Sequence, residues 1–272
     1  MLLAIQPTAA QPVSQESADG KRASLIAAAD LYRAQTIVTG QGEANRIIGF
    51  ASCLEDVLVK VSGALRLAGD PRLAPYKSEA AKLVRGFSYR DEKGGKPKND
   101  EQGTRDRSFF LAVDFDEAAI NEILAAMGVT PWLSRRPVLG VFVEMQQGPR
   151  RYVVAADSRQ TDLQGAALLS AAAKRGMPIM LPDVATLDEV GANDMVLAAI
   201  APGKLAQAAA RRGGEVLLTA RLAWDDQDLR WTADWQLDWH GKPQRWRLSA
   251  VTFDEAFRQG IGGAAQIIAA QQ

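Results

Sequence analysis

The chain has 272 residues, in which 32 Lys and Arg balance 32 Asp and Glu, with one Cys and one His. One cysteine excludes an internal disulfide, and one Cys with one His excludes a structural zinc site with the usual four ligands. The balanced charge, which holds in both halves of the chain, argues against a broad nucleic-acid or anionic-membrane surface. Hydrophobic residues make up 47% of the chain, which is typical of a globular protein.

The N-terminal residues suggest export. Residues 1–11 (MLLAIQPTAAQ) join a short apolar run to small residues, and Thr8 and Ala10 have the spacing that a signal peptidase accepts. Because no basic residue precedes the run, we expect the end of a longer signal sequence that starts upstream; the alternative is the frayed N-terminus of a cytosolic protein. No apolar stretch reaches the roughly 18 residues of a membrane-spanning helix. The sequence therefore predicts a periplasmic protein without a transmembrane segment.

The first half of the chain alternates strand and helix patterns after a polar, alanine-rich lead-in. β-branched and aromatic residues predict strands over residues 31–39, 86–91 and 107–115. Apolar residues at steps of three and four predict a helix over residues 42–62, and further helices are expected over 73–84 and 117–127. Gly63 is expected to end the helix over 42–62, and the helix over 117–127 is expected to begin at an Asp116 cap and to end at Gly128. Residues 93–106 are almost entirely polar, which predicts an exposed, mobile connection.

The second half begins after residues 129–137, which hold two prolines and no regular period. A nearly continuous apolar run over 138–145 predicts a strand that is buried on both faces. Shorter patterns predict further strands at 151–155 and 177–181, and helices at 163–174 and 205–212. A three-stranded meander is expected from residue 215 onward, followed by a final helix with Phe253, Phe257 and Ile261 on one face.

This order of elements predicts an α/β (α+β) fold with two consecutive small modules. We expect a signal remnant and lead-in over 1–30, an N-terminal module over 31–130 and a C-terminal module over 131–272. The second module would end in a tryptophan-rich antiparallel meander and a C-terminal helix.

The clearest pattern in the chain is the strict alternation of apolar and polar residues in this meander. Trp231, Trp235 and Trp239 fall on one face, where a row of indoles could bind sugar rings or peptides. The favoured alternative is that these indoles are core residues under the final helix, whose apolar face matches them. Asp234 and Asp238 fall on the outward face, together with Thr232 and Gln236, beside a sheet edge that could accept a partner strand.

No motif for catalysis or metal binding is found in the sequence. Gly40-Gln41-Gly42 lies between a strand and a helix, but Asn45 stands where a dinucleotide-binding turn has its third glycine. Residues 225–228 (DDQD) lack the glycine and glutamate of a calcium loop and predict a hairpin turn. Cys53 is expected to be a small buried hydrophobe, and His240 lies in a turn without a visible partner. We therefore assign no catalytic residue, metal or cofactor.

Several strings occur in an order that resembles a known family: LVKVSG at 58–63, GFSYR at 86–90, RPVLGVFVE at 136–144 and AAAKRGMPIMLPD at 171–183. Over residues 31–250 the chain resembles the proteobacterial domain-of-unknown-function family two-zero-six-six. This resemblance implies export to the periplasm and two α/β modules, with no catalytic motif to carry over. The element order of residues 137–270 is similar to the amino-terminal domain of TolB and to the periplasmic lipoproteins that activate penicillin-binding proteins. That second resemblance implies an envelope binding module.

The function expected from the sequence is a non-enzymatic binding module of the bacterial cell envelope whose partner is another envelope protein. One alternative is a carbohydrate- or peptidoglycan-binding protein that uses Trp231, Trp235 and Trp239. Another is a hydrolase of unrecognised type, for which the sequence offers neither a nucleophile nor paired acids. No nucleic-acid partner is expected.

Overall fold

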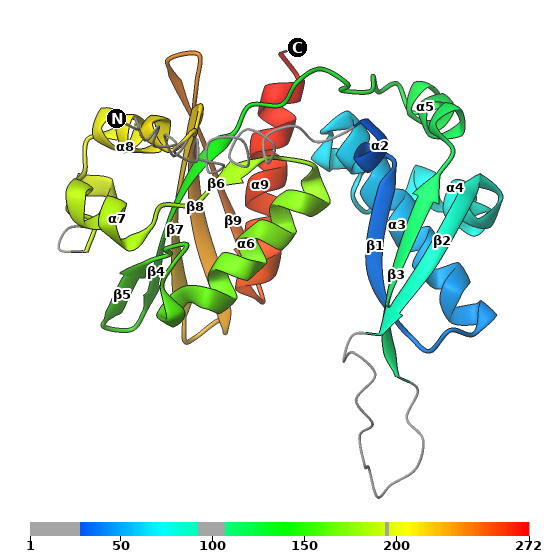
Figure 1. Cartoon of the computed structure of the whole chain (residues 1–272), viewed down its shortest axis with the longest axis horizontal. Helices are drawn as coiled ribbons and strands as arrows, with labels where there is room; N and C mark the ends of the chain where they lie inside the picture. Colours follow the sequence, from blue (N-terminus) through cyan, green and yellow to red (C-terminus); the bar gives the residue numbers. More distant parts are fainter. Residues whose placement is uncertain (1–27, 92–106, 194–195, 272) are drawn as a thin grey trace, which may run out of the picture.

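The computed structural model describes residues 28–91, 107–193 and 196–271. The expected signal remnant over 1–11 and the expected mobile connection over 93–106 lie outside the described residues. Figure 1 shows two sheets side by side, each with its own helices. The fold class is α/β (α+β), as expected, and the chain ends in a helix. The division into two independent domains at residues 129–137 stays a prediction.

The N-terminal part is built on a three-stranded antiparallel sheet in the order β1-β3-β2. Its strands are β1 (Arg33–Thr39), β2 (Val84–Asp91) and β3 (Ser108–Phe115). Helices α3 (Glu43–Ser62) and α5 (Glu117–Ala126) share one buried core with this sheet, which includes Leu58, Leu111 and Ile120. Short helices α2 (Ala28–Leu31) and α4 (Ala74–Ser78) complete this part.

Local signals in the sequence account for most of these boundaries. Gly63 ends α3 in the left-handed conformation, with a φ of 70°. Asp116 caps α5, where its side chain accepts a hydrogen bond from the Ala119 N–H at 3.0 Å. The helix expected over 73–84 is wrong as a continuous element. Pro75 occupies the first turn of α4, the position where a missing N–H costs least. Glu79 then leaves the helical conformation, with φ −110° and ψ 14°, so α4 ends at Ser78 and a separate 3-10 helix forms over Ala80–Leu83.

The C-terminal part is built on a six-stranded sheet in the order β5-β4-β7-β8-β9, with β6 also paired to β4. Its strands are β4 (Leu139–Gln147), β5 (Arg150–Val153), β6 (Ile179–Met180), β7 (Val216–Asp225), β8 (Arg230–Trp239) and β9 (Lys242–Ala250). Strand β4 pairs in parallel with β6 and β7, and the other pairs are antiparallel. The first seven residues of β4 are buried, as its apolar sequence predicts.

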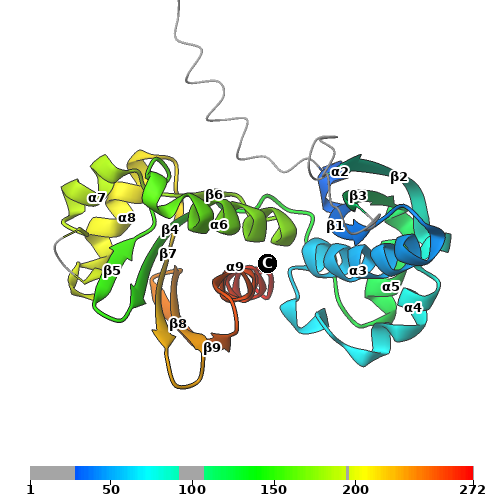
Figure 2. The same cartoon turned by 90° about the horizontal axis from the view of Figure 1, so that it is seen from below.

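The two faces of this sheet are covered unequally, as Figure 2 shows. Helices α6 (Asp162–Arg175) and α9 (Phe253–Ala269) pack on one face. On the other face, α7 (Val184–Val190) and α8 (Pro202–Arg211) form a second core with residues of β4 and β7, including Phe142 and Leu217. The described residues place no helix over β8 and β9 on that second face. Helix α7 was not expected, because seven residues are too few to show a helical period.

The two parts meet at Arg136, which lies in the connection between them and is buried. Its guanidinium packs on the Trp132 ring at 4.3 Å from the ring centroid. Its Nη1 and Nη2 atoms donate hydrogen bonds to five backbone carbonyls, those of Lys60, Val61, Trp132, Arg175 and Gly176. Four of these carbonyls belong to the C-terminal ends of α3 and α6, where the last turn leaves carbonyls without intrahelical partners and the helix dipole is negative. One cation therefore caps two helices and joins the two parts.

Candidate functional site: the open face of the C-terminal sheet

The tryptophan row of the meander lies in the core of the C-terminal part. Trp231 is buried, Trp235 is only 2% exposed, and both belong to the cluster that contains Phe257 and Ile261 of α9. Gly260 of α9 lies so close to Trp235 that a Cβ atom at Gly260 would be 2.0 Å from the indole ring. A sugar ring therefore has no access to these two indoles, and the alternative that uses them as a ligand platform is not supported by their position.

Trp239 differs from its neighbours in the row. Its side chain is half-buried, and its ring packs against His240 with 4.2 Å between the ring centroids. His240 has a positive φ of 50°, which suits its place in the turn between β8 and β9. The two rings pack together at the turn end of the β8–β9 hairpin. Among the described residues, no acid or nucleophile forms a hydrogen bond or ion pair with His240.

The outward face of the sheet carries a row of alternating charges across four strands. The strand registers place Glu144 of β4 beside Arg221 of β7, Arg221 beside Asp234 of β8, and Asp234 beside Arg247 of β9. Arg221 forms an ion pair with Glu144 at 3.5 Å, and Arg247 contacts both carboxylate oxygens of Asp234 at 2.5 and 3.1 Å. Cross-strand pairs of opposite charge stabilise a sheet modestly and fix its register.

Glu144 is the buried member of this row of charges. Its side chain is 1% exposed, and its Oε2 atom accepts a hydrogen bond from the Leu197 N–H at 2.7 Å. Arg151 of β5 lies 3.5 Å from the same oxygen. A buried carboxylate needs such partners because an unpaired charge in a protein interior is costly. Glu144 therefore connects β4 to the loop at Leu197 and holds the guanidinium of Arg221 at the surface.

A second polar row lies next to the first one. Gln236 of β8 accepts a hydrogen bond from Arg245 Nε of β9 at 2.8 Å and donates one to Asp238 at 3.0 Å. Asp234 is exposed and Asp238 is half-buried, and both lie on the side of the sheet opposite the indoles. The five residues singled out from the sequence are thus divided between a buried face and an open face.

The open face is hollowed into a groove of about 650 Å³. One side is apolar and is formed by Leu197, Ile200 and Pro202, and the floor is formed by the charged and amide side chains of β7, β8 and β9. Strand β9 is the last strand of the sheet, so its outer backbone edge has no strand partner among the described residues. The sequence of β9, KPQRWRLSA, has three basic residues and no acidic one. The site therefore combines a free, positively charged edge with a groove beside it.

The structure also describes the other residues that the sequence analysis considered for metal binding or catalysis. No group of three or more His, Cys, Asp or Glu in the described ranges could hold a metal ion. Cys53 is fully buried, as expected, and burial raises the pKa of its thiol to about 12, so that it stays protonated and poorly nucleophilic. Residues 225–228 form the expected turn, in which Asp225 accepts hydrogen bonds from the Gln227 and Asp228 N–H groups.

Among the helices that the structure describes, none has the length and apolarity needed to cross a membrane.

Comparisons with known proteins find one family model that matches part of the chain. Residues 26–133 match the model of a family described as a domain of unknown function (DUF8605). The sequence analysis expected a domain of unknown function, and the matching model is one. The expected family, two-zero-six-six, is not the family that matches. The expectation rested on short strings of residues, none of which is diagnostic by itself.

One solved structure with a detectable likeness is that of lipoprotein GNA1162 from Neisseria meningitidis. It is 19% identical over 42% of this chain and 77% of that chain, with a TM-score of 0.27. At that score the likeness carries no argument about fold or function. No curated protein matches the chain.

Proposed function

We propose that the protein is a non-enzymatic binding module of the bacterial cell envelope that holds an extended segment of a partner protein on the open face of its C-terminal sheet. The observation that carries this proposal is the free edge of β9 beside the groove. An exposed strand edge offers main-chain hydrogen bonds to an added strand, and the flanking side chains select its sequence. Export to the periplasm is supported by the spacing of Thr8 and Ala10 at the start of the sequence.

The charges on β9 indicate which segment fits. Arg245 and Arg247 lie on the outward face of the strand, whereas Trp246 faces α9. An added strand continues this alternation because its side chains point to the two faces in turn. A segment with acidic side chains at alternate positions and apolar ones between them therefore places carboxylates beside both arginines. Lysine at the same positions would place like charges together, which destabilises cross-strand pairs.

A peptide titration tests this choice of partner. A fluorescein-labelled short peptide of alternating Glu and Val is expected to raise its anisotropy with the protein, whereas the matching Lys and Val peptide is not. Arg247→Glu should weaken binding of the acidic peptide by at least about tenfold, because it reverses a charge beside the added strand.

Arg85→Glu is the matched control. Arg85 also lies on a strand and pairs with one aspartate, and its side chain is 63% exposed against 71% for Arg247. Equal binding of the acidic peptide by wild type and by the Arg247→Glu variant would refute the edge of β9 as the site. In cells, a photo-crosslinker at Ser249 should capture a partner from wild type and from Arg85→Glu, but not from Arg247→Glu.

A further inference from the structure

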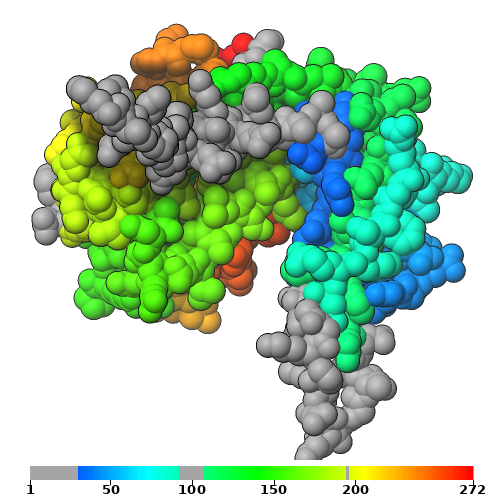
Figure 3. Space-filling model, viewed as in Figure 1, coloured from blue at the N-terminus to red at the C-terminus, as the bar shows by residue number. Residues whose placement is uncertain are grey.

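A second cavity lies between the two parts of the chain, away from the open face of the sheet. Its volume is about 640 Å³, within the range of small-molecule sites. In Figure 3, the blue atoms of the N-terminal part face the yellow-green atoms of the C-terminal part along this seam. The proposed partner-binding role makes no use of this cavity, which is called the seam cavity below.

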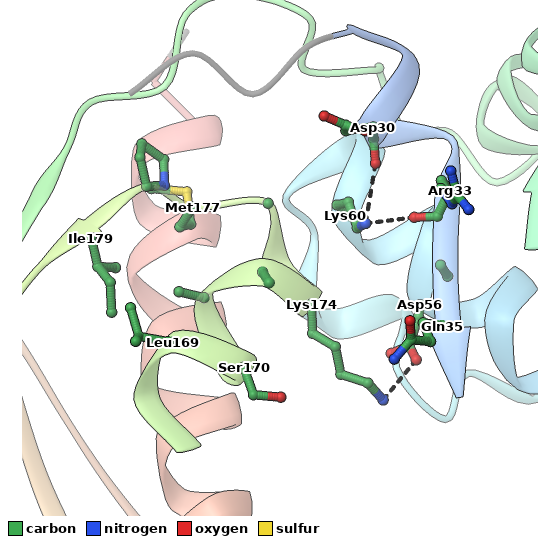
Figure 4. A pocket seen from close by; sticks show the side chains of 15 residues that line it. Asp30, Arg33, Gln35, Asp56, Lys60, Leu169, Ser170, Lys174, Met177 and Ile179 are labelled. Carbon is green, nitrogen blue, oxygen red and sulfur yellow. Dashed lines mark hydrogen bonds and ion pairs between the residues drawn. The ribbon is translucent and has the colours of Figure 1, made fainter. Parts of the chain in front are cut away.

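The two walls of the seam cavity differ in chemistry, as Figure 4 shows. The wall from the C-terminal part carries Leu169, Met177, Pro178 and Ile179, which are apolar. The opposite wall, from α2, β1 and α3, is polar and charged, and includes Arg33, Asp56 and Lys60. A ligand that fills the cavity therefore meets hydrocarbon on one side and charge on the other.

The charges along the cavity leave one cation without a carboxylate partner. Lys174 reaches across the cavity to Asp56, with 2.8 Å between Nζ and Oδ2, and Arg33 pairs with Asp114 at 3.5 Å. Lys60 is only 8% exposed, and its Nζ donates hydrogen bonds to the neutral carbonyls of Asp30 and Arg33, at 3.2 and 2.6 Å. No ion pair to Lys60 is formed within the described ranges. The carboxylates of Asp56 and Asp30 act on the Lys60 ammonium only from beyond ion-pair distance. A buried ammonium with no carboxylate in direct contact favours an anion beside it.

We propose that the seam cavity binds a small amphipathic anion, a carboxylate with an apolar chain, with its head group at Lys60 and its chain along Leu169 and Ile179. Burial lowers the pKa of Lys60 to about 8, so the ammonium is still present at pH 7. An ammonium–carboxylate hydrogen bond in a half-enclosed cavity is stronger than one in water because the local dielectric is lower.

The test uses dodecanoate at concentrations below micelle formation, measured by isothermal titration calorimetry on the full chain at pH 7. Wild type should bind dodecanoate, and Lys60→Met, which keeps the length of the side chain but not its charge, should bind at least about tenfold more weakly. Lys82→Met is the matched control, since Lys82 is an exposed lysine outside the cavity. It should bind as wild type does.

Circular dichroism shows whether Lys60→Met folds. If Lys60→Met does not fold, Leu169→Glu is used to test the proposal. Leu169 is exposed at the rim of the cavity, so its replacement leaves the cores intact. A carboxylate there should repel dodecanoate and weaken binding by at least about tenfold.

The proposal is overturned by any of four results. The first is that wild type does not bind dodecanoate. The second is that the folded Lys60→Met variant or Leu169→Glu binds dodecanoate within twofold of wild type, and the third is that wild type binds neutral 1-dodecanol equally well. The fourth is that wild type cosediments with phosphatidylglycerol vesicles but does not bind monomeric dodecanoate. The last result would indicate a membrane surface in place of an enclosed site. None of these outcomes bears on the edge of β9, so the two proposals fail separately.

Discussion

Gly260→Ala tests whether the tryptophan row is core, and so which face of the meander is free. A Cβ atom at position 260 would lie 2.0, 2.2 and 2.6 Å from three atoms of the Trp235 indole, well inside van der Waals contact. The indole has little room to move, since it is stacked on Trp246 with 6.2 Å between centroids and 8° between planes. Overpacking of this kind typically costs about 1–3 kcal/mol, against a helix-propensity gain of about 1 kcal/mol for Ala over Gly.

We expect Gly260→Ala to lower the free energy of unfolding by up to about 2 kcal/mol, which is the overpacking cost less the gain in helix propensity. The assay is urea unfolding followed by tryptophan fluorescence, with wild type and Gly203→Ala measured alongside. Gly203 is also in a helix, but a Cβ atom there meets nothing within 4 Å, so its replacement should leave stability unchanged or raise it by up to about 1 kcal/mol. If Gly260→Ala is as stable as Gly203→Ala, the close packing of α9 on Trp235 is wrong, and the indoles become available to a ligand.

Three further predictions follow from buried charges and caps. Arg136→Met should cost at least about 1–3 kcal/mol in urea unfolding, because it leaves buried carbonyls at the ends of α3 and α6 without a donor, and Arg136→Lys should recover only part of this. For Lys60, the pKa is lowered from 10.5 to about 8, so the unfolded chain holds more protons between these pH values and stability rises with pH across that window. The free energy of unfolding of wild type minus that of Lys60→Met should therefore increase by about 3 kcal/mol between neutral pH and pH 10.5 and above. A difference that does not change with pH would contradict this prediction. Asp116→Ala should cost about 1 kcal/mol through loss of the α5 cap, as read from the urea midpoint.

The sequence predicts the elements of this protein well where a local pattern decides the structure. The alternation in β8 predicted both the meander and its burial under α9, because a strand with one apolar face needs a cover. Gly63 and Asp116 predicted helix ends for reasons internal to the backbone. Short elements were predicted less well. The seven residues of α7 are too few to show a helical period, and the helix expected over 73–84 is divided into α4 and a 3-10 helix.

The charged row of the open face could be predicted only in part. Arg245 and Arg247 alternate with Trp246 and Leu248, a signal that could have marked the outward face of β9. The pairing of Arg247 with Asp234, and of Arg245 with Gln236, depends on the register between β8 and β9, which the sequence of either strand alone does not reveal. Glu144 sits in an apolar run and pairs with residues far along the chain. Arg136 gave no signal either, because its acceptors are the ends of two helices distant in sequence.

Amide hydrogen exchange of β9 tests the central proposal most directly. The outer N–H groups of β9 have no strand partner in the sheet and should exchange quickly in the free protein. With the peptide of alternating Glu and Val at saturation, the exchange of amides in Lys242–Ala250 should slow, while the amides of β1 in the other sheet remain unchanged. Unchanged exchange in β9 at saturation, or protection that appears elsewhere, would contradict strand addition at this edge.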